Sequence, residues 1–125
     1  MHNLRKLRSS KKLLLPFLAL AFALLIPVSQ VSAAYSPWAI VTPDKVYNTT
    51  SIYVQAGQKI NVTVHNNGNG YFDYWVTSGG KTVTEGTVDA GKKKSYSVGA
   101  PVGTAVLHIQ CPTSWCDGQG RLQTY

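Results

Sequence analysis

Apolar and polar residues alternate through the stretch 58–98, and this is the strongest pattern in the chain. Residues 59–65 have the sequence Lys-Ile-Asn-Val-Thr-Val-His, and residues 72–76 resume the same two-residue period as Phe-Asp-Tyr-Trp-Val. Such a period is typical of a β-strand with one face on a core and the other toward water. We therefore expect four strands here, arranged as an antiparallel meander.

Residues of turn-forming type separate these four predicted strands. Asn and Gly make up 66–70, and both tolerate the positive φ angles that reverse a chain. Ser78-Gly79-Gly80 is a second turn by composition. Gly86 interrupts the third strand, and an isolated Gly inside a strand pattern predicts a β-bulge.

The rest of the chain after residue 34 continues the β pattern. We expect further strand segments at 39–41, 51–54, 104–111 and 121–125, with the last preceded by a turn at 117–120. No helical periodicity extends over about 11 residues in this part of the chain. Seven or eight short strands with frequent turns predict an all-β fold, a small antiparallel β-sandwich of immunoglobulin-like or jelly-roll kind.

The first 33 residues have the three parts of a secretory signal peptide. Five basic residues precede an apolar run of 16 residues at 13–28, and Val31-Ser32-Ala33 resembles a signal-peptidase site. We expect cleavage after Ala33 and secretion of a single domain, residues 34–125. The alternative is an uncleaved N-terminal anchor, although the apolar run is shorter than the roughly 20 residues of a spanning helix.

Removal of the leader changes the interpretation of charge. Five of the 12 basic residues lie in the leader and all five acidic residues follow it, so the formal net charge falls from +7 to +2. A nucleic-acid partner is therefore not indicated.

The two cysteines, Cys111 and Cys116, are expected to form a disulfide, because exported proteins occupy an oxidising environment. This bond would fix the loop between them. Two Asn-x-Thr sequons, at Asn48 and Asn61, would be glycosylated only in a eukaryotic host.

Residues for catalysis or metal binding are few. His65 and His108 are the histidines of residues 34–125, and both are expected on the surface. A blue-copper site is not indicated, because no His follows the cysteines and the only Met is Met1. The chain lacks the common hydrolase motifs. We therefore expect no catalytic site, no metal and no cofactor.

Aromatic and basic residues are the candidates for binding. Large rings can hold sugars or protein partners on a sheet face, although any single ring is more often part of the core. The candidate binding surface consists of Tyr71, Trp75, Trp38, Tyr53 and Trp115. Lys92, Lys93 and Lys94 are a candidate contact for an anionic partner, or else a solvated strand start that protects a sheet edge.

These observations favour a secreted, non-enzymatic module for structure or interaction, as in surface or matrix assembly or adhesion. Its partner would be a protein or a cell-surface polymer. The segment 34–42 could add as a strand to a neighbouring copy and give a homo-oligomer. The alternatives are an antibacterial or membrane-active effector and a carbohydrate-binding module.

Overall fold

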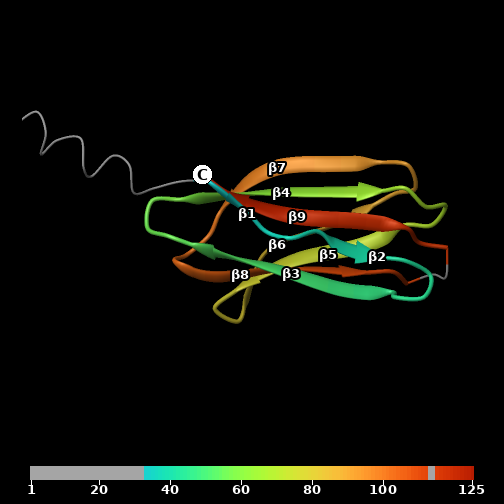
Figure 1. Ribbon diagram of the computed structural model, residues 1–125, viewed down its shortest axis with the longest axis horizontal. Coiled ribbons are helices and arrows are strands. Elements are labelled where there is room, and N and C mark those ends of the chain that lie inside the picture. The colour runs from blue at the N-terminus through green and yellow to red at the C-terminus, as the bar shows by residue number, and fades with distance from the viewer. Residues whose placement is uncertain (1–32, 113–114) are drawn as a thin grey trace, which may run out of the picture. The chain divides into compact units, whose positions relative to one another are not determined.

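The computed structural model describes residues 33–112 and 115–125, which form nine β-strands and no helix (Figure 1). Within these ranges there is accordingly no helix long and apolar enough to cross a membrane. The predicted signal peptide lies outside the described residues, except for Ala33, which is exposed. The strands are β1 (Ala34–Tyr35), β2 (Ala39–Val41), β3 (Tyr47–Val54), β4 (Lys59–Asn66), β5 (Phe72–Ser78), β6 (Lys81–Val88), β7 (Lys93–Gly99), β8 (Gly103–Gln110) and β9 (Gly118–Thr124).

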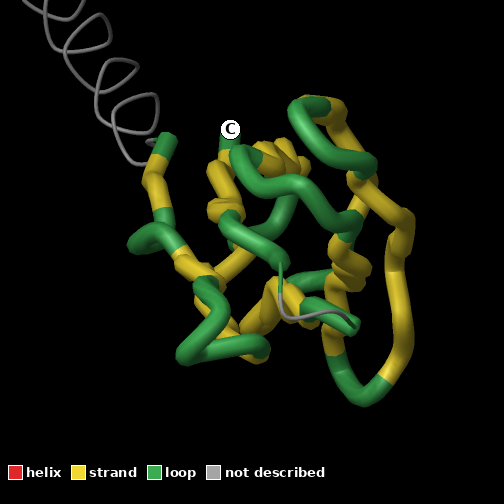
Figure 2. The backbone as a smooth tube through the Cα atoms, turned by 90° about the vertical axis from the view of Figure 1, so that its right-hand side faces the viewer, coloured by secondary structure: helices red, strands yellow, loops and turns green. Residues whose placement is uncertain are grey.

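The strands form two antiparallel sheets. The five-stranded sheet has the order β1-β9-β4-β7, with β2 also paired to β9, and the four-stranded sheet has the order β3-β8-β5-β6. Figure 2 looks along the strands and shows the two layers. The strands pair as in one long hairpin whose tip is the β5–β6 turn. From the open end to the tip, its successive pairs are β2–β9, β3–β8, β4–β7 and β5–β6. The hairpin is rolled up, so that successive pairs lie alternately in the five-stranded and the four-stranded sheet. The predicted β-sandwich is confirmed, and its strand order is that of a jelly roll.

The expected meander is wrong in its pairing. β4 does not pair with β5, and β6 does not pair with β7; instead β5 and β6 form a hairpin in the four-stranded sheet, and β7 returns to pair with β4. β4 and β5 each have one apolar face that needs cover. By changing sheet twice, the chain packs those faces against each other, which a single flat meander cannot do.

The core lies between the sheets and consists of the inward residue of each alternating pair. Ile60, Val62 and Val64 are buried, as the alternation predicts, whereas Asn61, Thr63 and His65 on the opposite side are half-buried. In β5 the inward residues are Phe72, Tyr74 and Val76. Leu107 and Ile109 from β8 and Leu122 from β9 complete the centre of the core.

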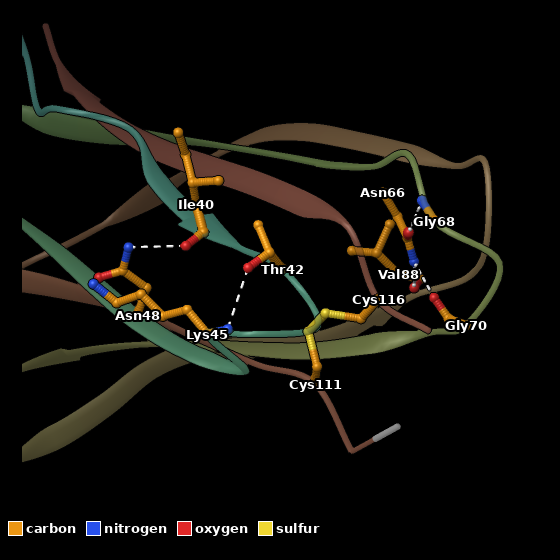
Figure 3. Close-up of a disulfide and its surroundings, with 10 residues drawn as sticks. All are labelled: Ile40, Thr42, Lys45, Asn48, Asn66, Gly68, Gly70, Val88, Cys111 and Cys116. Carbon is orange, nitrogen blue, oxygen red and sulfur yellow. Dashed lines mark hydrogen bonds between the residues drawn. A yellow bond between two sulfur atoms is a disulfide. The ribbon is translucent and has the colours of Figure 1, made fainter. Parts of the chain in front are cut away.

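The turn at 66–70 forms by a mechanism other than the one expected, since none of these residues has a positive φ. Asn66 is instead fully buried, and its Nδ2 donates to the carbonyls of Gly70 and Val88, both at 2.8 Å (Figure 3). Its Oδ1 accepts from the backbone N–H of Gly68 at 2.9 Å. By contrast, the two-residue β5–β6 turn has positive φ at both Gly79 and Gly80, as tight hairpins require.

The structure differs from the sequence-based predictions for Gly86 and for the turn at 117–120. At Gly86 there is no bulge, because the register of β5 with β6 shifts between Val76 and Thr77 instead. A Cβ at Gly86 would lie 2.7 Å from the Oη of Tyr74, so the position needs glycine for space. The predicted turn at 117–120 is also wrong in part, since β9 begins at Gly118.

The expected disulfide between Cys111 and Cys116 is confirmed, with both residues buried (Figure 3). The chain next to it contacts the Asn66 turn. The carbonyl of Trp115 accepts from the N–H groups of Asn69 and Gly70 at 3.2 and 3.3 Å, and that of Asp117 accepts from Asn67 at 2.7 Å. The disulfide and the buried asparagine therefore stabilise one end of the sandwich together.

The segment predicted to join a neighbouring molecule is paired within its own chain. Residues 34–35 and 39–41 both lie against β9. Between them, Ser36 exchanges backbone and side-chain hydrogen bonds with Leu122 at 2.8 and 2.9 Å, and the carbonyl of Pro37 accepts from Thr50 Oγ1 at 2.8 Å. Strand addition to another copy would first have to break these bonds.

Candidate binding face

The outer face of the five-stranded sheet is formed by polar side chains from three adjacent strands. β4 is central, with β7 on one side and β9 on the other. The register aligns these residues in rows across the sheet. The three rows are Ser97–Asn61–Gln123, Ser95–Thr63–Arg121 and Lys93–His65–Gln119.

This face is hollowed into a cleft of about 410 Å³, which we call the β4 cleft. Two rings, those of Tyr35 and Trp38, lie at its edge, on the strand β1 and the link that follows it. The residues that line the β4 cleft are Tyr35, Trp38, Asn61, Thr63, His65, Lys93, Ser95, Gln119, Arg121 and Gln123.

Arg121 is held between the cleft and its aromatic edge. The carbon at the centre of its guanidinium lies 4.4 Å from the ring centroid of Tyr35 and 4.4 Å from that of Trp38. Both are cation–π contacts, which hold the group over the two rings. The N–H groups of a guanidinium point outward in its plane. No carboxylate or other hydrogen-bond acceptor among the described residues pairs with them.

The neutral polar groups of the cleft differ in how far they are already paired. Ser95 Oγ lies 3.1 Å from Thr63 Oγ1 and accepts a longer bond, 3.4 Å, from the amide of Asn61. The side-chain amides of Gln119 and Gln123 have no partner within residues 33–112 and 115–125. The cleft thus presents both hydrogen-bond donors and acceptors to a ligand.

The opposite face, on the four-stranded sheet, has different chemistry. A depression there is lined by Asp73 and Glu85 but by no basic residue. Asp73 accepts a hydrogen bond from Thr87 Oγ1 at 2.7 Å. The two depressions of the described sandwich therefore differ in charge, since the β4 cleft has basic residues and no acidic one.

His108 lies on this second face in a self-contained cluster. Its ring stacks on that of Trp75, with centroids 4.9 Å apart and planes within 2°. Its Nδ1 lies 2.8 Å from the Tyr47 hydroxyl and its Nε2 3.0 Å from Thr77 Oγ1. Burial lowers the pKa of His108 below its ordinary value. Both ring nitrogens of His108 are already hydrogen-bonded within the sheet, so this histidine has a structural role on the sheet surface.

The five predicted aromatic residues do not gather on one surface. Trp38 borders the β4 cleft, Trp75 and Tyr53 lie on the opposite sheet, and Tyr71 and Trp115 lie in loops beside the Asn66 turn. Trp115 is 71% exposed and Trp38 is 38% exposed. The structure therefore divides the predicted binding surface into three separate places.

The three lysines also separate. Only Lys93 lines the β4 cleft. Lys94 points the other way, and its Nζ lies 5.8 Å from the ring centroid of Tyr74, whereas Lys92 precedes β7 in the turn. An inward-pointing lysine on an edge strand such as β7 opposes pairing with another sheet.

Sequence reasoning did not single out Arg121, Gln119 or Gln123. The signal was present, because polar residues alternate with Gly118, Gly120 and Leu122 through β9. Because glycine stands at two of the inward positions, this stretch does not show the apolar–polar alternation that indicates a strand. As for metal sites, no group of three or more His, Cys, Asp or Glu side chains comes together among the described residues.

Comparison with known proteins supports the fold alone. No family model matches the sequence, and no curated protein is significantly similar to it. A solved structure with a similar fold is the pre-peptidase C-terminal domain of a collagenase from Bacillus anthracis, with 14% identity over 72% of this chain and 87% of that chain, at a TM-score of 0.50. Two others are the carbohydrate-binding module CBM36 in complex with calcium and xylotriose (11% identity, 74% and 98% coverage, TM-score 0.47) and Bacillus endospore appendages, described as disulfide-linked pili (16%, 74% and 83%, 0.44).

Proposed function

We propose that the protein is an exported, non-enzymatic interaction module that holds an extracellular partner in the β4 cleft. The composition of that cleft is the observation that best supports the proposal. Amide, hydroxyl and basic side chains from three strands lie beside two aromatic rings in one depression of about 410 Å³. Ligand sites commonly have this order of volume and combine rings with a few oriented polar groups.

Export is supported by two independent features. The sequence begins with the parts of a signal peptide, and the domain that follows contains a disulfide of the kind that persists outside the cytosol. Binding without turnover fits the placement of the titratable groups. His65 belongs to the β4 cleft, whereas Asp73 and His108 lie on the opposite sheet.

A partner that runs along the sheet fits this site better than assembly by strand addition. The strand-addition hypothesis requires residues 34–42 to be free, and they are bonded to β9. The membrane-active alternative has no comparable support, because the five candidate rings are spread over three places. A sugar chain is one form of the partner proposed here, since side-chain amides and hydroxyls complement sugar hydroxyls.

The test uses protein recovered from the medium after expression of the full chain. Its intact mass should correspond to residues 34–125, which also checks cleavage after Ala33. Co-sedimentation with insoluble cell-wall or matrix material then measures binding. Trp38→Ala should reduce the bound fraction several-fold. The matched variant Trp75→Ala, on the opposite sheet, should bind like the parent once thermal melting shows that both are folded.

Two results would contradict the proposal. One is that the parent protein stays in solution with every wall or matrix preparation. The other is that Trp75→Ala abolishes binding while Trp38→Ala does not, which would move the contact surface to the four-stranded sheet.

A further inference from the structure

We infer that the ligand of the β4 cleft is an acidic polysaccharide, a sugar chain that bears carboxylates at intervals. The inference rests on the proposed function and adds the chemical class of the partner. Its first support is charge. The cleft contains Lys93, Arg121 and His65 but no Asp or Glu, and the acidic residues Asp73 and Glu85 line the opposite face. An anionic ligand is therefore attracted to the β4 cleft and repelled by the acidic depression on the opposite sheet.

Arg121 is the residue best placed to hold a carboxylate. The rings of Tyr35 and Trp38 contact its guanidinium, with both ring centroids 4.4 Å from its central carbon, which restrains its position before any ligand arrives. Its in-plane N–H groups remain available, because no acid among the described residues pairs with them. A restrained guanidinium with free N–H groups matches the bidentate geometry of a carboxylate. Arg121 is thus held in the cleft by two rings, with no hydrogen-bond acceptor among the described residues for its N–H groups.

The distance between the two cations favours a polymer over a single small anion. Lys93 and Arg121 lie two strands apart and in adjacent rows of the sheet. A strand spacing of about 4.8 Å and a two-residue rise of about 6.8 Å place their Cα atoms on the order of 12 Å apart. The ring of Tyr35 on β1 also holds the Arg121 guanidinium on the side of β9 away from β7, so a carboxylate bound there is not also placed against Lys93. A chain with charges at intervals can pair with both cations.

The neutral groups favour a sugar chain over a plain polyanion. Five amide or hydroxyl side chains lie in the cleft with the two cations: Asn61, Thr63, Ser95, Gln119 and Gln123. A ligand that carries more hydroxyls than charges satisfies this set, because amides and hydroxyls both donate and accept. A polyphosphate backbone with few hydroxyls could accept from the N–H groups of Gln119 and Gln123 but would offer few donors to their carbonyl oxygens.

The experiment measures the affinity of the secreted protein for defined polymers by tryptophan fluorescence, since Trp38 borders the cleft. The acidic polysaccharides are polygalacturonate, alginate and hyaluronate; dextran serves as the neutral polysaccharide and poly(glycerol phosphate) as the phosphate polymer. We expect at least one acidic polysaccharide to bind roughly tenfold more tightly than dextran or poly(glycerol phosphate), with an affinity that falls as salt rises.

The variants test whether the cations of the cleft are responsible. Arg121→Gln should weaken binding by roughly tenfold, as loss of a charge-assisted pair predicts. Lys93→Gln should weaken binding by a smaller factor, because a lysine ammonium is a point charge and lacks the paired N–H donors of arginine. Lys81→Gln removes the same unit charge from the β6 end of the opposite sheet and should leave binding unchanged. Lys93→Gln keeps the test informative if Arg121→Gln does not fold.

Each contrary outcome has a distinct meaning. If dextran binds as tightly as the acidic polymers and Trp38→Ala abolishes both, the acidic class is wrong while the proposed function stands. If poly(glycerol phosphate) binds most tightly, the saccharide class is wrong. If none of the three acidic polysaccharides binds, the inference fails, and the co-sedimentation test of the proposed function decides whether the cleft binds another partner. If Lys81→Gln weakens binding as much as Arg121→Gln does, the attraction is one of overall charge and the cleft is not the site.

Discussion

At the scale of single residues, a glycine can be required because a neighbouring side chain occupies the space that its Cβ would need. Gly86 pairs with Tyr74 across the β5–β6 ladder, and its backbone has no positive φ. The constraint is space, because a Cβ there would lie 2.7 Å from the Tyr74 hydroxyl oxygen. That hydroxyl also lies 2.9 Å from the Tyr96 hydroxyl, and burial together with this hydrogen bond raises the pKa of Tyr74.

Gly86→Ala should therefore lower the free energy of unfolding by about 1–3 kcal/mol, because the Tyr74 ring must move. Gly99→Ala in β7 is the matched control. A Cβ at Gly99 would have no atom within 4 Å and no unfavourable φ, so this variant should be neutral or stabilising by up to about 1 kcal/mol. Urea unfolding measures both. Equal losses in the two variants would show that glycine is required for some other reason.

Asn66 illustrates the opposite case, a buried polar side chain that is needed for its bonds. Replacement by alanine would leave the Gly70 and Val88 carbonyls and the Gly68 N–H without this partner. We expect a loss of about 2–4 kcal/mol in the free energy of unfolding, since each unsatisfied buried group costs about 1–3 kcal/mol. Asn67→Ala, at an exposed neighbour, should change it by less than about 0.5 kcal/mol. A small effect at both positions would contradict the role assigned to Asn66.

His108 gives a prediction on pH. Burial lowers its pKa in the folded protein, so the unfolded chain binds the proton more readily. The contribution of His108 to stability is therefore complete above its ordinary pKa of about 6.5 and is lost as pH falls through that value. Urea unfolding from about pH 8 to about pH 5 should show that His108→Gln flattens this acid-side decline. Parallel pH curves for the variant and the parent would contradict it.

At the scale of strands and loops, the alternation predicted which residues face inward but not which strand lies beside which. A two-residue period contains no information on which strand pairs with which, so the alternation did not predict that β4 and β5 lie in different sheets. β9 was missed in part because its inward positions include Gly118 and Gly120. A Cβ at Gly120 would lie 2.8 Å from Ile109 and 2.9 Å from Leu107. These two side chains therefore fill the inward space that an apolar residue of β9 would otherwise occupy, and the expected alternation is absent from the sequence.

The disulfide also acts at this scale, because the chain beside it bonds to the Asn66 turn. Reduction, or the double variant Cys111→Ser/Cys116→Ser, should lower the free energy of unfolding by about 2 kcal/mol, as expected for a short ring. Amide hydrogen exchange should accelerate at Asn69 and Gly70, whose N–H groups donate to the Trp115 carbonyl. The N–H of Lys45, bonded within its own turn to Thr42, is the internal control (Figure 3). Equal acceleration at Lys45 would indicate global opening instead.

At the scale of the whole described domain, the rolled hairpin places depressions of unlike charge on its two outer faces. Strands distant in sequence, β4, β7 and β9, meet on one face and bring Lys93, His65 and Arg121 into the β4 cleft. The sequence could indicate that Asn61, Thr63 and His65 face outward. It could not indicate that Arg121 would lie beside them, because that juxtaposition depends on the pairing of β9 with β4.

The central claim is that the outer face of the five-stranded sheet is the contact surface. NMR of the labelled, secreted protein tests it most directly, during titration with whichever of the three acidic polysaccharides binds most tightly. Backbone and side-chain amide shifts should change at residues 61–65, 93–97 and 119–123, together with the Trp38 indole. Signals from β3, β5, β6 and β8 should stay in place. Shifts that cluster instead around Trp75, Asp73 and Glu85 would contradict the account.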